Sequence, residues 1–174
     1  MVERISKRFL SLTLVAVMLL SLLPAFALPA FAATSGTLNG LSVDGIDASY
    51  TGDANDAWSA SGTTITGSVV AVKGGCSTTN YNSTLTITNN KPTAATLSFD
   101  YAVVVNSGTV QVDGTAVSSD GSYSYTKELA AGDSIKVYLK SGGTTATKIT
   151  MTNIALVSDV TATTTFQPLC GGGW

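Results

Sequence analysis

The stretch LSFDYAVVVNSGTVQVDG, residues Leu97 to Gly114, decides the fold. From Leu97 to Val105 every second residue is apolar or aromatic, which is the period-2 pattern of a strand with one buried face. The dipeptide Ser107-Gly108 predicts a tight turn, and a two-residue loop there would pair Val105 with Val110. The pattern therefore predicts two antiparallel strands that are neighbours in one sheet.

A second turn signal lies at the end of the same stretch. Asp113-Gly114 is the preferred sequence of a type I′ hairpin, and such a turn pairs Val110 with Val117. We therefore predict three consecutive strands in one register. A slip of one residue would expose every apolar side chain of the set.

Similar alternation recurs along the chain, and no segment longer than a turn shows helical periodicity. Near the end of the chain the apolar phase shifts between Met151 and Ile154, which predicts a β-bulge at Thr152-Asn153. The further strands that we expect are Thr37–Val43, Thr64–Val72, Ser83–Thr88, Gly121–Leu129, Ile135–Leu139, Ile149–Val157 and Val160–Phe166.

About nine or ten short strands with frequent turn signals indicate an all-β protein, and we predict a jelly-roll-like β-sandwich. An immunoglobulin-like sandwich is the alternative. Its usual Cys…Trp…Cys order is absent, because Trp58 precedes both Cys76 and Cys170.

The first 32 residues have the organisation of a secretory signal peptide. A positive segment with Arg4, Lys7 and Arg8 precedes an apolar run, Phe9–Leu23, and Ala30-Phe31-Ala32 forms an A-x-A cleavage site. A retained signal anchor is the alternative. We therefore divide the chain into a signal peptide (1–32), a β-sandwich domain (33–166) and a Gly-rich tail (167–174) that looks like the end of a linker or a truncation.

The charge balance excludes some classes of partner. The 174 residues hold 9 Lys and Arg against 11 Asp and Glu, and no His. Loss of residues 1–32 leaves 6 basic and 10 acidic residues, a net charge of −4, with no Arg. We predict no nucleic-acid partner, because such partners require a basic face. We also predict no membrane partner after signal cleavage, because no other segment approaches the roughly 20 apolar residues of a membrane span.

Two cysteines, Cys76 and Cys170, permit one disulfide in a secreted chain. The alternatives are two free thiols or a bridge between chains at Cys170. An intramolecular bridge would close a loop of nearly the whole domain.

The loop DGIDASYTGDAND, residues 44–56, concentrates aspartates. Asp44, Asp47, Asp53 and Asp56 offer the hard oxygen ligands that Ca²⁺ prefers, so a structural Ca²⁺ is the metal hypothesis. Their spacing matches no EF-hand. A solvated loop also uses Asp, Asn and Gly, and that alternative stays open.

Four aromatic residues are candidates for a sugar-stacking surface: Trp58, Tyr123, Tyr125 and Tyr138. A flat ring next to polar groups suits carbohydrate, because the ring stacks on C–H groups while polar edges form hydrogen bonds. The alternative is that Tyr123 and Tyr125 pack in the core with their hydroxyls at its rim, and that Trp58 fills the core.

Catalysis is the weakest hypothesis. Without His, a Ser-His-Asp or Cys-His arrangement is impossible. Asp100, Glu128 and Asp133 leave a carboxylate pair formally open. We predict that the protein is not an enzyme.

Two runs carry a resemblance to a known class of proteins. TLTITNNKPTAATLSFDY (84–101) and GSYSYTKELAAGDSIKVYL (121–139) resemble the N-terminal β-sandwich modules of secreted, multidomain surface proteins of Gram-positive bacteria. More loosely, they resemble jelly-roll carbohydrate-binding modules. The resemblance covers about Leu41 to Phe166 and implies a noncatalytic module on an exported protein. No binding residue carries over from it.

These observations predict a secreted or cell-surface, noncatalytic module for ligand binding or adhesion, with an extracellular glycan or a surface protein as partner. The alternative function is a structural or self-associating module of a surface layer or filament, because edge strands permit strand addition.

Overall fold

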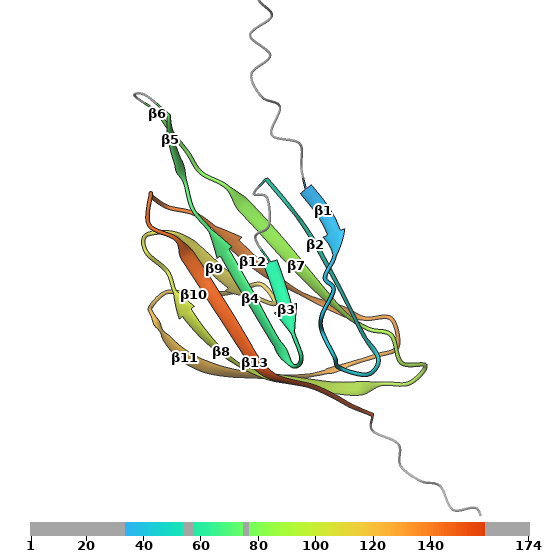
Figure 1. Cartoon of the computed structure of the whole chain (residues 1–174). Coiled ribbons are helices and arrows are strands. Elements are labelled where there is room, and N and C mark those ends of the chain that lie inside the picture. The colour runs from blue at the N-terminus through green and yellow to red at the C-terminus, as the bar shows by residue number, and fades with distance from the viewer. Residues whose placement is uncertain (1–33, 54–57, 75–76, 159–174) are drawn as a thin grey trace, which may run out of the picture. The chain divides into compact units, whose positions relative to one another are not determined.

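Thirteen strands and no helix make up the part of the chain that the computed structural model describes, which is residues 34–53, 58–74 and 77–158 (Figure 1). Two antiparallel sheets face each other, and a small hairpin projects from one end. The predicted all-β sandwich is confirmed, although the strands outnumber the expected nine or ten. In this part of the chain no helix is long and apolar enough to cross a membrane.

Sheet A has six strands. In spatial order they are β1 (Thr34–Thr37), β2 (Ile46–Gly52), β7 (Asn82–Asn89), β12 (Ser134–Lys140), β9 (Thr109–Val112) and β10 (Thr115–Val117).

Sheet B has five strands, and a separate hairpin has two. In spatial order sheet B runs β11 (Gly121–Leu129), β8 (Ala95–Val104), β13 (Thr147–Ser158), β4 (Thr64–Val69) and β3 (Trp58–Ser61), and the hairpin joins β5 (Val72–Gly74) to β6 (Ser77–Thr79).

From β7 onward, successive strands alternate between the two sheets, except that β10 pairs with β9 in sheet A. β7, β9 and β12 belong to sheet A, whereas β8, β11 and β13 belong to sheet B. None of these six strands pairs with the next of them along the chain. In an immunoglobulin-type sandwich, neighbours such as the last two strands pair within one sheet. The alternation therefore favours the jelly-roll-like winding over the immunoglobulin-like alternative.

The predicted pairing of Val105 with Val110 is wrong. A tight turn does form, but one residue earlier than the predicted Ser107-Gly108: its central residues, Asn106 and Ser107, have φ values of 43° and 64°, and Gly108 N donates a hydrogen bond to Val105 O. The chain then crosses to sheet A instead of returning along β8, because β11 and β13 occupy both sides of β8.

Close packing holds this crossing in place. The buried Thr147 donates a hydrogen bond from Oγ1 to Val105 O at 2.9 Å. A Cβ on Gly108 would lie 2.0 Å from Thr147 Oγ1. Only glycine fits between β8, β9 and β13 at this point.

Two other local predictions are confirmed. Asp113 and Gly114 both have positive φ, 49° and 78°, and the hairpin they form pairs Val110 with Val117. In β13 the register shifts between Thr152 and Ala155, as the change of apolar phase predicted. The bulge leaves Met151 and Ile154 both buried.

The strand bounds of the N-terminal third differ from the prediction. The strand expected at Thr37–Val43 is wrong, because β1 covers Thr34–Thr37 and shares only Thr37 with it. The strand expected at Thr64–Val72 ends at Val69. In contrast, β7, β11 and β12 contain the strands that alternation predicted. The remaining predictions lie outside the described residues; these are the signal peptide (1–32), the strand Val160–Phe166, the tail (167–174) and both Cys76 and Cys170.

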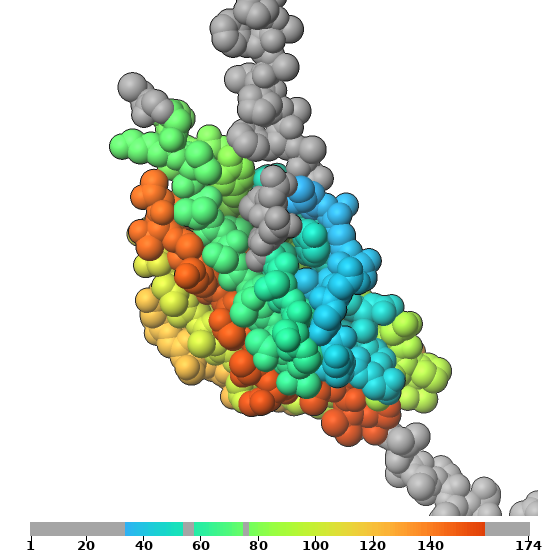
Figure 2. Space-filling model, viewed as in Figure 1, coloured from blue at the N-terminus to red at the C-terminus, as the bar shows by residue number. Residues whose placement is uncertain are grey.

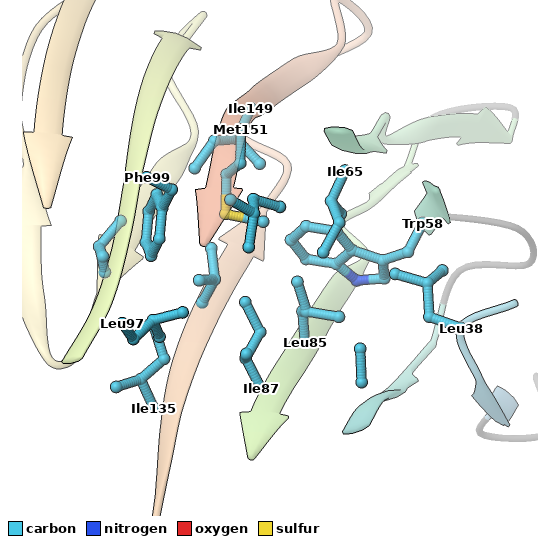
Figure 3. Packing of buried hydrophobic residues seen from close by; sticks show 14 of the residues in the cluster. Leu38, Trp58, Ile65, Leu85, Ile87, Leu97, Phe99, Ile135, Ile149 and Met151 are labelled. Atoms are coloured by element: carbon cyan, nitrogen blue, oxygen red, sulfur yellow. The ribbon is translucent and has the colours of Figure 1, made fainter. Parts of the chain in front are cut away.

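The core fills the space between the sheets (Figure 3). Ile87 and Ile135 of sheet A face Leu97, and Ile65 packs beside the indole of Trp58. Gly67 lies opposite Trp58 in the β3–β4 pair, and a Cβ there would lie 2.4 Å from the indole. The glycine within β4 therefore makes room for the largest side chain of the core.

Backbone and indole contacts join the two sheets along one edge, which we name the bridged edge (residues 38–43, β3 and β4). Gly62 N donates to Gly40 O at 2.9 Å, and Ser42 N donates to Gly62 O at 2.7 Å. Trp58 Nε1 donates to Ser83 Oγ of sheet A at 2.9 Å. Figure 2 shows the blue N-terminal segment lying directly against the green β3–β4 pair.

Side chains link the two sheets along the opposite edge, which we name the tyrosine edge (β11 and the β9–β10 hairpin). Tyr125 Oη donates to Asp113 Oδ2 at 2.9 Å, and Lys127 Nζ contacts the same oxygen at 2.7 Å. The rings of Phe99 and Tyr125 stack with centroids 4.9 Å apart, and those of Tyr101 and Tyr123 at 5.3 Å.

Candidate functional site

The outer face of sheet B contains a shallow hollow of about 180 Å³. It lies where β8, β11 and the bulge of β13 meet, and most of the side chains that reach it are polar. The lining residues are Ser98, Phe99, Asp100, Ser124, Tyr125, Thr126 and Asn153.

The carboxylate of Asp100 is the centre of this hollow. Ser124 Oγ donates to Asp100 Oδ1 at 2.7 Å, and Asn153 Nδ2 donates to Asp100 Oδ2 at 3.0 Å. The three residues come from three strands, since Ser124 pairs with Asp100 across β11 and β8 and Asn153 lies in β13. Each carboxylate oxygen therefore has one fixed donor and keeps lone pairs free for a ligand.

The bulge is what brings Asn153 to this position. Alternation along β13 would send residue 153 to the buried face, next to the outward-facing Thr152. Instead Asn153 has φ 55° and is exposed. A non-glycine residue with positive φ stores strain, and bulges often redirect a side chain toward a functional site. The local distortion thus places an amide beside the carboxylate.

Hydrogen bonds keep the carboxyl group of Asp100 ionised. The bond from Asn153, and then that from Ser124, lowers the pKa of Asp100 below its ordinary value. The side chain is exposed, and the two hydrogen bonds outweigh the opposing effect of burial, which raises the pKa. At neutral pH the hollow presents an oriented anion with an amide and hydroxyl groups beside it.

This set of groups suits hydrogen bonding better than proton transfer. A carboxyl group with a lowered pKa is a poor general acid. Glycoside hydrolysis also requires a second carboxyl group within roughly 10 Å. Of the lining residues only Asp100 carries one. Glu128 lies four residues beyond Ser124 on β11, about 13 Å along the strand.

The four predicted aromatic residues do not form one surface. Trp58 is 5 % exposed, so it belongs to the core and is not available to stack on a ligand. Tyr123 and Tyr125 are neighbours, but their rings stack on Tyr101 and Phe99 inside the sandwich.

The hydroxyl groups of the two β11 tyrosines are also engaged. Tyr123 Oη lies 3.0 Å from Ser119 O and Tyr125 Oη lies 2.9 Å from Asp113. This is the arrangement of the alternative in which the rings pack and the hydroxyls lie at the rim. Tyr138 is half-buried on the outer face of sheet A, between Thr84 and Gln111.

The predicted calcium ligands are apart as well. Asp44 forms an ion pair with Lys91 at 3.3 Å, and Asp53 accepts a hydrogen bond from Asn82. Asp44 precedes β2 and Asp53 follows it, which separates them by roughly 25 Å of extended chain.

Asp47 is exposed within β2, and Asp56 lies outside the described residues. Within residues 34–53, 58–74 and 77–158 no group of three or more acidic, Cys or His side chains is placed to hold a metal ion.

Sequence reasoning named Asp100 only as a formal catalytic carboxylate and missed Ser124 and Asn153. Two signals in the sequence point toward them. Alternation puts Asp100 on the polar face of its strand, and the phase shift of β13 marks the bulge. The link between β8 and both β11 and β13 is a long-range pairing that local patterns do not encode.

No protein-family model matches this chain, and no curated protein is significantly similar to it.

Proposed function

We propose that the protein is an exported, noncatalytic β-sandwich module that binds an extracellular glycan at the Asp100 hollow. The observation that supports this proposal is the oriented set of Asp100, Ser124 and Asn153 in a hollow open to solvent. Sugar hydroxyls are both donors and acceptors, so a carboxylate beside an amide and hydroxyls complements them.

The proposed export, and with it a secreted or cell-surface location, rests on the predicted signal peptide. The resemblance to Gram-positive surface modules agrees with this location. The acidic, Arg-free mature sequence supports a neutral polar ligand over nucleic acid.

The test is a glycan array probed with the protein after removal of the predicted signal peptide. Titration calorimetry on each positive glycan follows, with the wild type and three variants. We expect Asp100→Asn to weaken binding at least tenfold, because the amide nitrogen replaces one acceptor with a donor. The matched control is Asp47→Asn, which removes the same charge from the outer face of sheet A.

The third variant separates the two outer faces. Tyr138→Ala removes the half-buried ring on sheet A, and we expect unchanged binding. If Tyr138→Ala abolishes binding while Asp100→Asn does not, the ligand binds sheet A and the assignment to the hollow is wrong. Absence of binding across broad polysaccharide sets would reject the glycan function itself.

A second candidate function is self-association, and one observation favours it. β11 is a nine-residue strand at the end of sheet B, and no described strand pairs with its outer side.

A further inference from the structure

We infer that β11 is an interaction surface for a second copy of this chain, which adds antiparallel through a two-fold axis at Tyr125. This inference specifies the partner and register of the second candidate function, and it does not depend on ligand binding at the hollow.

Length distinguishes β11 from the other strands that end the two sheets. β1, β3 and β10 have 4, 4 and 3 residues, whereas β11 has 9. β11 pairs with β8 in an unbroken register from Gly121 to Leu129. It contains neither proline nor a bulge, two of the devices with which proteins protect exposed edges.

A lysine is another protective device, and here its charge is already compensated. Lys127 Nζ lies 2.7 Å from Asp113 Oδ2 in an ion pair. The hydroxyl groups of Tyr123 and Tyr125 also form hydrogen bonds, to Ser119 O and Asp113 Oδ2. These side chains of β11 are thus already held by partners and the edge carries little net repulsion, so they lose little further side-chain entropy on binding.

The sequence of β11 is complementary to itself in one register. With Tyr125 on the axis, all nine residues pair, from Gly121 with Leu129 of the second copy to Ser124 with Thr126 of the second copy. Glu128 then faces Ser122, and Lys127 faces Tyr123, so each charged residue lies opposite an uncharged one. No like charges face each other.

The neighbouring register is less favourable. With Ser124 on the axis, Asp120 would face Glu128 of the second copy, and like charges opposite each other destabilise a strand pair. In both registers odd-numbered residues lie opposite odd-numbered residues and even-numbered opposite even-numbered. The inner face of one sheet B is therefore continuous with the inner face of the other. Only the Tyr125 register combines full pairing with the absence of opposed charges.

Such a dimer would join two copies of sheet B into one continuous sheet. The two Asp100 hollows would lie on the same face, about 16 Å apart from three strand spacings and a two-residue offset. A repeating polymer could then contact both hollows at once.

The test uses sedimentation equilibrium of the protein without its predicted signal peptide, over a concentration range of about 1–500 μM. We expect a reversible monomer–dimer equilibrium. Ser122→Glu places a carboxylate opposite Glu128 of the second copy, twice per dimer. It should weaken association about tenfold, whereas Ser122→Lys should strengthen it by a similar factor.

The controls address register and fold. Ser122→Glu combined with Glu128→Lys should restore the wild-type dissociation constant, because each new pair has opposite charges. Ser68→Glu adds the same charge at an exposed position on β4 and should change nothing. Ser122 is exposed, so thermal midpoints of the monomers should agree within about 2 °C.

Two outcomes overturn the inference. One is a strict monomer at the highest concentration. The other is a dimer whose dissociation constant is the same in the wild type, Ser122→Glu and Ser122→Lys. Glycan titration of the Ser122→Glu monomer keeps the two proposals apart, since the hollow retains all its lining residues in this variant.

Discussion

The two edges of the sandwich are closed by different means. Along the bridged edge, backbone hydrogen bonds between residues 40–42 and Gly62 join the sheets, and a buried indole spans them. Along the tyrosine edge, two tyrosine hydroxyls and one lysine reach across to loops. Backbone closure engages the N–H and C=O of Gly62, whereas side-chain closure leaves the outer side of β11 unpaired by any described strand.

The two edges should also differ in how much their contacts contribute to the free energy of unfolding. At the bridged edge the indole contact is buried, and the backbone hydrogen bonds of Gly40, Ser42 and Gly62, although at exposed residues, have fixed geometry, so both should tolerate little change. Contacts of the tyrosine edge are partly exposed and ionisable, so they should be weaker and depend on pH. Four predictions, in order of decreasing effect, test this contrast.

Gly40→Ala should cause the largest loss. A Cβ there would lie 2.5 Å from Ala60 O, and the residue has φ +94°. Steric conflict with the backbone adds to the left-handed strain, and we expect a loss of about 3 kcal/mol in the free energy of unfolding. Urea denaturation measures it. Gly62→Ala is the matched control, because φ is +60° with no atom within 4 Å, and about 1 kcal/mol is expected.

Trp58→Phe should rank second. The smaller ring leaves a void beside Gly67 and removes the donor to Ser83 Oγ. We expect a loss of about 2 kcal/mol, measured by the same denaturation curves. A loss below that of Asp113→Asn would contradict the proposed ranking of the two edges.

Asp113→Asn should cost about 1 kcal/mol at pH 7, since the lysine it binds is partly exposed. The hydrogen bond from Lys127 lowers the pKa of Asp113 in the folded state. Its stabilising effect is therefore complete above the unfolded pKa of about 4 and disappears as the pH falls through the lower folded pKa. Thermal melts from pH 7 to pH 2 should show a shallower acid slope in the variant, and parallel slopes would refute this role.

Tyr125→Phe should have the smallest effect at neutral pH, about 0.5 kcal/mol, because the ring and its stacking on Phe99 remain. Burial, and then the bond to Asp113, raises the pKa of Tyr125. Wild-type stability should therefore fall as the pH rises above about 10, where the unfolded tyrosine ionises. The variant should lose less stability there, although Tyr101, whose pKa burial also raises, still contributes.

Local chemistry predicts much of this fold. Alternation located β7, β8, β11 and β12, and the phase shift located the bulge of β13. These features are determined by residues that are neighbours in sequence. The Asp113-Gly114 turn, for example, forms because these two residues tolerate positive φ. Local chemistry also indicates a turn after Val105, although the turn forms at Asn106-Ser107, one residue before the predicted Ser107-Gly108.

Local sequence patterns do not predict which sheet a strand joins. Both turns have two residues in the left-handed region, yet one forms a hairpin and the other crosses between sheets. What separates them is the pairing of β8 with β11 and β13, strands distant in sequence, and the hydrogen bond from Thr147 of β13 to Val105 O holds the crossing in place. The Asp100 hollow depends on the same kind of long-range pairing, so the sequence could supply its residues but not their assembly.

The central position of β13 in sheet B has a consequence for how the chain folds. β13 lies between β8 and β4, and it is the last strand of the described chain. During synthesis, residues 64–140 emerge before any segment that can join β4 to β8. Because that strand must close long loops, sheet B should form late and in one step, on the millisecond-to-second scale typical of non-local β-topologies. A ribosome-bound chain that stops before Thr147 should therefore remain sensitive to protease.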